Sequence, residues 1–283
     1  MGGVGPRLCG IGDEAAADLH DQIRIHAELG LAGIELRTVN GRGAHEWTAS
    51  EAELIAGQLA EAGLEVPVVD TPVGGWAVTI GSDFDAELAV LRRAAENALI
   101  ARCRRLRVMS YPNDGRTDAA WRACALWRLR ELTTCARDLG VTLLHENCVG
   151  WAARDAASTL DMVRDVAGLG LIFDAGNGLA YGYDGVEYLR AVLEQVEHVH
   201  IKDGIRRGDD VVFGLPGDGE ADLAGCVQLL AGAGFDGWYS LEPHVAYLPH
   251  RGVSRGPQDR EQAYRACAER FRALLDAHAV TSA

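Results

Sequence analysis

Four residues of the types that bind metal ions each stand at or near the end of a short apolar run. They are Glu146 in LLHEN, Asp174 in LIFDAGN, His200 in VHIKD and Glu242 in YSLEPH. Three carboxylates that meet in a site of low dielectric constant repel one another, and a bound divalent cation removes that repulsion. We therefore predict that these four side chains hold one divalent metal ion, provided that the fold brings them together.

The donor set also limits the identity of the ion. Carboxylate and imidazole ligands, with positions open to water or substrate, suit a hard or borderline ion better than a structural zinc held by thiolates. We expect Mn²⁺, with Mg²⁺, Co²⁺ and Zn²⁺ as alternatives. Cys148 lies two residues past Glu146 and is interpreted as part of the pocket wall, not as a ligand.

Eight short β-branched runs alternate with eight helical patterns along the chain. The runs cover residues 7–11, 33–36, 65–70, 105–109, 141–146, 170–174, 196–202 and 238–242. The helical patterns cover about 14–29, 50–62, 83–100, 118–139, 153–166, 186–195, 221–233 and 259–278. Strands separated by helices pair in parallel through right-handed crossovers, which is typical of α/β folds.

Eight such units predict a (β/α)8 TIM barrel, in which the active site lies at the carboxyl ends of the strands. The four candidate ligands lie on the last four runs, which a barrel places side by side. An open doubly wound sheet is the alternative, but it normally carries GxGxxG after the first strand, and the segment GIGDE at 10–14 stops short of that motif. Asp13 is predicted to cap the first helix.

The composition is that of an ordinary globular protein, with 48% hydrophobic and 24% charged residues among 283. No low-complexity stretch or long linker divides the chain, so residues 1–283 are predicted to form a single barrel domain. The formal net charge of −14 repels phosphate backbones and predicts no nucleic-acid partner.

The seven cysteines are scattered and none are spaced as CxxC, which is typical of reduced thiols. The first residues lack the charged start and apolar run of a signal peptide. Since no apolar segment reaches the ~20 residues that span a bilayer, we expect no membrane segment and a cytoplasmic location.

The motifs HEN, FDAGN, HVHIKD and SLEPH, in this order, resemble those of the sugar phosphate isomerase/epimerase superfamily. That group has a xylose isomerase-like TIM barrel and includes D-tagatose 3-epimerase-type enzymes. The segment GIELR at 33–37 and the loop at 214–219 are similar to family features, and the resemblance covers nearly the whole chain. It departs from the family pattern at Cys148 and Asn177, where many relatives carry histidine.

The resemblance implies that Glu146 and Glu242 are the two proton carriers, one on each face of the substrate. The implied function is a metal-dependent isomerase or epimerase of a sugar, cyclitol or keto-polyol, which abstracts a proton next to a carbonyl through a metal-stabilised enediolate. A metal-dependent lyase on the same site, either a dehydratase or a C-glycoside-cleaving enzyme, is the alternative, because related barrels include such enzymes. A binding subunit without activity is a third hypothesis, and the intact pair of glutamates argues against it.

Further residues near the strand ends are predicted to contact a small-molecule substrate. Glu35, in the second run, is predicted to orient one of the metal ligands. Lys202 and Asp203 either bind substrate oxygens or form an ion pair behind the ligands. Barrel relatives often dimerise, so a homo-oligomer is an additional expectation. The predicted substrate-binding residues are Arg37, Trp76, Asn177, Lys202, Asp203 and His244.

Overall fold

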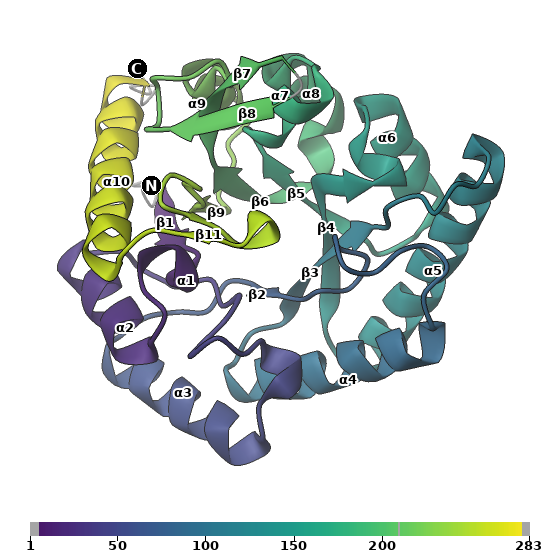
Figure 1. The fold of residues 1–283 in the computed structure, drawn as a ribbon, viewed down its shortest axis with the longest axis horizontal. Helices are drawn as coiled ribbons and strands as arrows, with labels where there is room; N and C mark the ends of the chain where they lie inside the picture. Colours follow the sequence, from purple (N-terminus) through teal and green to yellow (C-terminus); the bar gives the residue numbers. More distant parts are fainter. Residues whose placement is uncertain (1–5, 209, 279–283) are drawn as a thin grey trace.

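A curled parallel sheet forms the centre of the computed structural model, which describes residues 6–208 and 210–278 (Figure 1). Its strands are hydrogen-bonded in the order β1-β9-β6-β5-β4-β3-β2, and every pair in it is parallel. The strands are β1 (Arg7–Gly10), β2 (Val69–Asp70), β3 (Arg105–Ser110), β4 (Thr142–Gly150), β5 (Gly170–Asp174), β6 (Val196–Ile201) and β9 (Trp238–Leu241).

The predicted strand 33–36 closes the barrel without forming a regular strand. Parallel bridges join Ile11 to Glu35 on one side and Leu36 to Val69 on the other. The segment makes backbone hydrogen bonds to the chain at β1 on one side and to residues 65–70 on the other, but the pairing on both sides is limited to single bridges. The predicted TIM barrel is confirmed, but the second strand position is held by isolated bridges.

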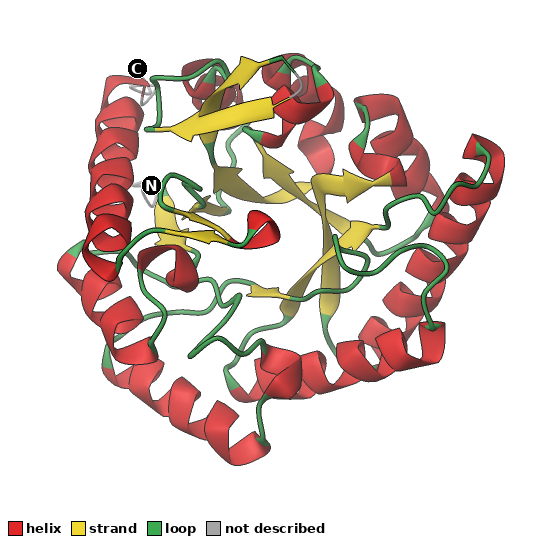
Figure 2. Cartoon of the chain, in the orientation of Figure 1, coloured by secondary structure: helices red, strands yellow, loops and turns green. Residues whose placement is uncertain are grey.

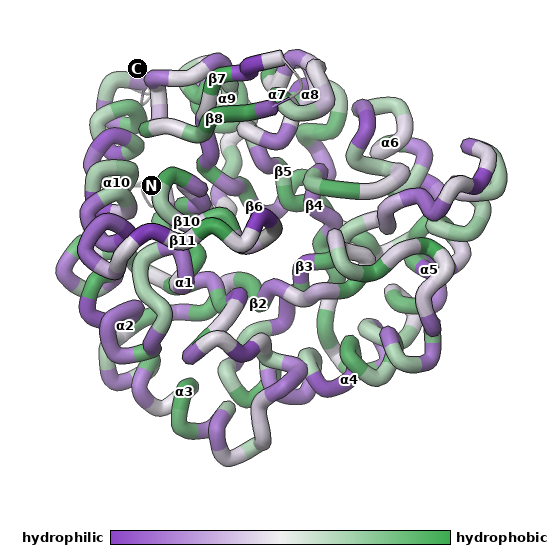
Figure 3. The backbone as a smooth tube through the Cα atoms, viewed as in Figure 1, coloured by the Kyte–Doolittle hydropathy of each residue, from purple (hydrophilic) through white to green (hydrophobic). Residues whose placement is uncertain are grey.

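Helices form the outer ring around the sheet (Figure 2). Along the outer helices, hydrophilic and hydrophobic residues alternate in short stretches, as expected when one face packs on the strands and the other meets water (Figure 3). The helices are α1 (Gly12–Ala15), α2 (Leu19–Glu28), α3 (Ala49–Glu61), α4 (Phe84–Ile100), α5 (Asp118–Asp138), α6 (Ala156–Asp165), α7 (Asn177–Tyr181), α8 (Gly185–Val192), α9 (Leu223–Gly232) and α10 (Pro257–His278). None of the helices in the described residues is long and apolar enough to cross a membrane.

The predicted first helix was wrong in its start and its cap. Residues 14–29 divide into α1 and α2, with extended backbone at Ala16. Asp18 caps α2, because its carboxylate accepts the backbone N–H of Asp21 at 3.0 Å. Asp13 is instead buried, and its carboxylate accepts hydrogen bonds from Arg37 at 2.9 Å and from the Thr38 hydroxyl at 2.6 Å. A long-range ion pair therefore overrides the local capping preference.

Other predicted helices agree to within a few residues or are divided. A capping box precedes α3, with Thr48 and Glu51 bonded reciprocally. The predicted helix 153–166 begins later, as α6, after a 3₁₀ turn at Trp151–Ala153. The predicted helix 186–195 is represented by α8 and a 3₁₀ turn, and the short helix α7 precedes it at the pocket.

Two β-hairpins that were not predicted lie at the mouth of the barrel (Figure 1). The first joins β7 (Asp203–Arg207) to β8 (Asp210–Gly214), and the second joins β10 (Tyr247–Leu248) to β11 (Val253–Ser254). A 3₁₀ turn at Pro249–Arg251 forms the tip of the second hairpin. Residues of both hairpins line the central pocket, so these insertions narrow its entrance.

A small apolar layer inside the barrel supports the residues above it. Val68, Leu144 and Ile172 form a buried cluster separate from the large core under the helices. Because side chains two residues apart point to the same face of a strand, Glu146 and Asp174 lie on the same inner face as this layer. The strands thus carry an apolar plug and, one step nearer their carboxyl ends, a layer of polar groups.

Candidate metal centre

The four predicted metal ligands converge in the structure. One atom from each of Glu146, Asp174, His200 and Glu242 lies within 4.8 Å of the corresponding atom of every other, and all four residues are buried. They come from β4, β5, β6 and the end of β9, which are neighbours in the sheet. The two glutamates stand at the ends of this row, with Asp174 and His200 between them.

The nitrogen of His200 that faces the carboxylates is held apart from them. Its Nδ1 atom lies 3.6 Å from Glu146 Oε1, 3.9 Å from Asp174 Oδ2 and 3.4 Å from Glu242 Oε2. Among the described residues, this nitrogen has no hydrogen-bond partner, and Asp174 Oδ2 beside it is contacted by the Lys202 ammonium group. Buried polar atoms are seldom left in this way, and a set of donor atoms around one point is what a cation needs. The group can therefore hold a divalent metal ion.

The three carboxylates have different affinities for protons. Burial opposes ionisation of Glu146, but Arg107 and His200 outweigh it and lower its pKa to about 2. For Glu242, burial is outweighed by Lys202 and the neighbouring histidines, so its pKa lies well below the usual value. Burial and the two glutamates raise the pKa of Asp174 to about 7, despite Lys202. The flanking glutamates are thus ionised at neutral pH.

Two buried cations, Lys202 and Arg107, neutralise part of the acidic charge. Lys202 Nζ lies 2.7 Å from both Asp174 Oδ2 and Glu242 Oε2. Arg107, which the sequence analysis did not single out, contacts Glu146 and Asp70, each at 3.1 Å. A charged residue within an apolar strand pattern such as RLRVM was the signal for it, because alternation turns Arg107 toward the barrel interior.

Arg37 connects the metal centre to the first βα segment. Its guanidinium group donates to Glu242 at 3.0 Å, to Glu14 at 2.6 Å and to Asp13 at 2.9 Å. Glu14 also accepts from His244, both at the ring Nδ1 at 2.9 Å and at the backbone N–H. His244 has a left-handed backbone (φ 55°), a conformation uncommon outside glycine, and Glu14 holds it there. Asp13 and Glu14 were missed as site residues because their partners are distant in sequence.

Glu35 occupies the orienting position that the sequence predicted. Its carboxylate lies 2.8 Å from His198 Nε2 and 3.0 Å from His200 Nε2, and all three residues are buried. Since the Nε2 atom of His200 is engaged here, its Nδ1 atom is directed at the three carboxylates. Such a carboxylate behind a metal-binding histidine fixes the ring and its tautomer.

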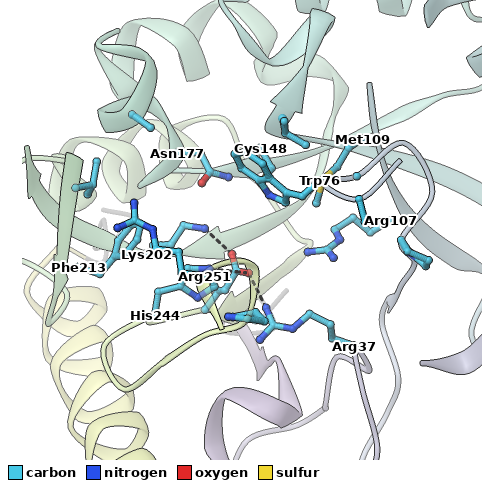
Figure 4. A pocket seen from close by; sticks show the side chains of 18 of the residues that line it. Arg37, Trp76, Arg107, Met109, Cys148, Asn177, Lys202, Phe213, His244 and Arg251 are labelled. Carbon is cyan, nitrogen blue, oxygen red and sulfur yellow. Dashed lines mark hydrogen bonds and ion pairs between the residues drawn. The ribbon is translucent and has the colours of Figure 1, made fainter. Parts of the chain in front are cut away.

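A pocket of about 480 Å³ opens above these groups (Figure 4). Five of the six predicted substrate-binding residues line it, namely Arg37, Trp76, Asn177, Lys202 and His244. The side chain of Asn177 donates to Glu146 Oε1 at 3.0 Å, and its backbone N–H donates to Asp174 Oδ1 at 2.9 Å. Cys148 lies in the wall of the pocket, as expected.

Asp203, the sixth predicted residue, is not among the pocket-lining residues. Its carboxylate accepts backbone N–H groups of Gly204, Gly217, Gly219 and Ala221 at 2.8 to 3.1 Å. A β-carbon at Gly219 would lie 2.1 Å from this carboxylate, so the loop needs glycine there. Asp203 therefore holds the loop 214–221 against the first hairpin.

Comparison with known proteins agrees with this architecture. The model of the xylose isomerase-like TIM barrel family matches residues 23–247. Among curated proteins, the chain is 27% identical to an inosose dehydratase of Clostridium botulinum over 134 residues, which is 40% of this chain and 44% of the relative. It is 28% identical to the rhizopine catabolism protein MocC of Rhizobium meliloti over 132 residues, which is 41% of this chain and 40% of the relative. Both matches cover less than half of either chain.

Solved structures share the fold over nearly the whole chain. One is a 3-keto-D-glucoside 4-epimerase, YcjR, of E. coli, with a TM-score of 0.71, 18% identity, and coverage of 96% of this chain and 99% of the other. Another is a D-tagatose 3-epimerase-like protein, with a TM-score of 0.73, 17% identity, and coverage of 96% and 99%. At such low identity, these likenesses concern the fold.

Proposed function

Because the chain belongs to the xylose isomerase-like TIM barrel family, we propose that it is a divalent-metal-dependent isomerase or epimerase of a sugar, cyclitol or other keto-polyol. The observation that carries this proposal is the row of four convergent ligands with a glutamate at each end. Glu146, Asp174, His200 and Glu242 would hold the ion, and Mn²⁺ suits their three carboxylates and one imidazole. When bound, the ion supplies a Lewis acid that polarises a carbonyl group.

Glu146 and Glu242 are suited to carry protons at the carbon next to that carbonyl. Both carboxylates are ionised near neutral pH, which is the form that accepts a proton. They stand on opposite sides of Asp174 and His200. Removal of a proton by one glutamate and its return by the other gives epimerisation, whereas its return to the neighbouring carbon gives isomerisation.

The surrounding polar groups would orient the substrate and the two glutamates. Lys202 and Arg37 each donate to Glu242, and both line the pocket, where a substrate hydroxyl can reach them (Figure 4). Asn177 and Arg107 fix Glu146 through one oxygen each. Each proton carrier is thus held in place by hydrogen bonds, as catalysis by positioned groups requires.

A lyase on the same site is the second candidate, and the curated relatives favour it because several are inosose dehydratases. Loss of a hydroxyl group beta to the abstracted proton turns the same first step into an elimination. The residues that would remove the proton are unchanged, and the substrate decides the outcome. Product mass therefore separates the two reactions.

The test combines metal analysis with solvent deuterium exchange. The purified protein and a Glu242→Ala variant are analysed for bound metal, after reconstitution with Mn²⁺, Mg²⁺, Co²⁺ or Zn²⁺. Wild-type protein is then incubated in D₂O with a panel of ketoses and cyclitol ketones. One metal ion per chain, lost in the variant, and deuterium in a product of otherwise unchanged skeleton are expected. Loss of water indicates the lyase, and a wild-type protein that binds no divalent ion contradicts both.

A further inference from the structure

The pocket changes character between its floor and its entrance. We call the four metal ligands and the cations paired with them, Lys202, Arg37 and Arg107, the floor of the pocket. The wall above the floor is mainly apolar. Two large side chains of this wall are unusually accessible, since Trp76 is 54% exposed and Tyr181 is 37% exposed. We call the apolar wall the collar, and it consists of Trp76, Met109, Tyr181, Phe213 and Pro249.

The loop that carries Trp76 is fixed at its base. The backbone N–H of Gly74 donates to the buried carboxylate of Glu87 at 2.8 Å, and its carbonyl accepts the N–H of Tyr111 at 2.8 Å. The Tyr111 hydroxyl and Arg128 also donate to Glu87. A β-carbon at Gly74 would lie 2.2 Å from the Met109 carbonyl oxygen, so the chain passes too close to β3 for any other residue. The backbone at the base of the Trp76 loop is therefore held by buried hydrogen bonds.

The opposite parts of the collar are also held by specific contacts. Tyr181 donates to the carbonyl of Cys148 at 3.0 Å, and its ring stacks on Tyr183 with centroids 6.0 Å apart and 9° between planes. Phe213 packs edge-on against His244 with centroids 5.3 Å apart. An exposed aromatic group that is fixed rather than mobile loses little entropy when it receives a ligand.

The cations that line the pocket are already paired with carboxylates. Lys202 and Arg107 each contact two acidic groups, and Arg37 contacts three. Arg251, at the tip of the second hairpin, lies 2.6 Å from Asp210. A phosphate would compete with these carboxylates for its partners. An uncharged group above the floor is better matched to the collar.

We propose that the substrate of this pocket is a polyol that carries an aromatic substituent, with the polyol on the floor and the aromatic ring against Trp76 and Tyr181. The assignment of the polyol to the floor rests on the proposed function. The pocket volume of about 480 Å³ lies within the range of roughly 300–1,000 Å³ in which sites bury drug-sized ligands. Aromatic rings in offset or edge contact attract one another beyond the burial of their surface.

The test compares two uncharged probes, phenyl β-D-glucopyranoside and methyl β-D-glucopyranoside, by calorimetric titration of the Mn²⁺-loaded protein. They differ only in the group on the anomeric oxygen. We expect the phenyl glucoside to bind at least about tenfold more tightly, since roughly 25 cal/mol is gained per Å² of apolar surface buried. Trp76→Ala is expected to reduce this ratio at least about threefold, and Trp76→Phe to keep most of it.

Trp127→Ala is the matched control, because Trp127 is 47% exposed on α5 and does not line the pocket. It should leave the ratio of the two affinities unchanged. Equal binding of the two glucosides by wild-type protein, or tighter binding of glucose 6-phosphate than of either, overturns the proposal. A protein that binds metal and exchanges deuterium yet does not distinguish the glucosides contradicts the collar alone. Preference for the phenyl group without any metal binding contradicts the proposed function alone.

Discussion

The floor and the collar of the pocket are built from different parts of the fold. The floor lies at the strand ends, where buried carboxylates form ion pairs with Arg107 and Lys202. The collar is carried by the loop after β2, by the end of β3, by α7 and by the two hairpins. Strand positions are fixed by backbone ladders, whereas loops accept insertions and substitutions without loss of the barrel.

Because of this difference, we expect the floor to determine the reaction and the collar to determine which substrate fits. A change in the floor alters groups that contact the metal ion or the reacting carbon, and each such group has several charged partners. A change in the collar alters one wall of the pocket and leaves those partners in place. Substitutions in the two regions should therefore differ in size and in the quantity that they change.

The largest effect is expected at the two flanking glutamates. Glu146→Gln keeps an oxygen that can accept from Asn177, but it removes the group that would accept a proton. Exchange of substrate hydrogen with D₂O should fall at least about a hundredfold, and Glu242→Gln should act likewise. Glu61→Gln on the exposed surface of α3 serves as the control. Full exchange in the double variant would remove both glutamates from the chemistry.

A smaller effect is expected behind the floor, at Glu35. An amide in Glu35→Gln offers one oxygen in place of two, so it cannot accept from both His198 and His200. Affinity for Mn²⁺, measured by competition with a chelator, should fall about 10- to 100-fold. The exposed Glu53→Gln should not change it. Unaltered affinity with an intact fold would show that His200 needs no support to present its Nδ1 atom.

The floor was predictable from the sequence because its signal is periodic. Each ligand ends or lies within a β-branched run, and alternation along a strand fixes which side chains point inward. Glu35 was found in the same way. Asp13 and Glu14 were missed because their role depends on Arg37 and His244, which no local pattern connects to them.

The collar was less predictable, because loops carry no periodic signal. Trp76 was singled out, but the other residues of the collar come from the end of β3, from α7 and from two hairpins that were not expected. The first hairpin did leave a trace, since DVVFG, with two adjacent valines, follows a turn that contains Gly208. Where such a hairpin folds over a barrel depends on tertiary contacts such as the pair between Arg251 and Asp210.

A third prediction concerns β4, the strand that carries Glu146, on the side that faces away from the barrel interior. His145 precedes Glu146 on β4 and is buried, and among the described residues neither ring nitrogen has a hydrogen-bond partner. Burial lowers its pKa to about 4, against about 6.5 in an unfolded chain. Between pH 6.5 and about 4, His145 is therefore protonated in the unfolded state but neutral in the folded state. The free energy of unfolding consequently decreases as the pH falls through this interval.

The change amounts to about 1.4 kcal/mol per pH unit in that interval, or on the order of 3 kcal/mol in all. His145→Leu, which cannot be protonated, should lower the slope of unfolding free energy against pH by that amount, as measured by urea titration between pH 4.5 and 6.5. His20→Leu, at an exposed position, is the control. An unchanged slope in His145→Leu would mean that the ring takes up its proton without unfolding the strand.

The smallest effect is expected where the two hairpins meet, above the collar. Asp210 and Arg251 form an ion pair at 2.6 Å, but their side chains are 57% and 42% exposed. Exposed pairs contribute little to stability because water screens them. We expect Asp210→Asn to change KM for a substrate at most about fivefold and to leave kcat and metal content unaltered. If KM instead rises more than tenfold with no loss of metal, the contact between the hairpins holds the collar in its binding form. The collar would then depend on a defined tertiary contact, as the floor does, and the contrast between a fixed floor and a tolerant collar would no longer hold.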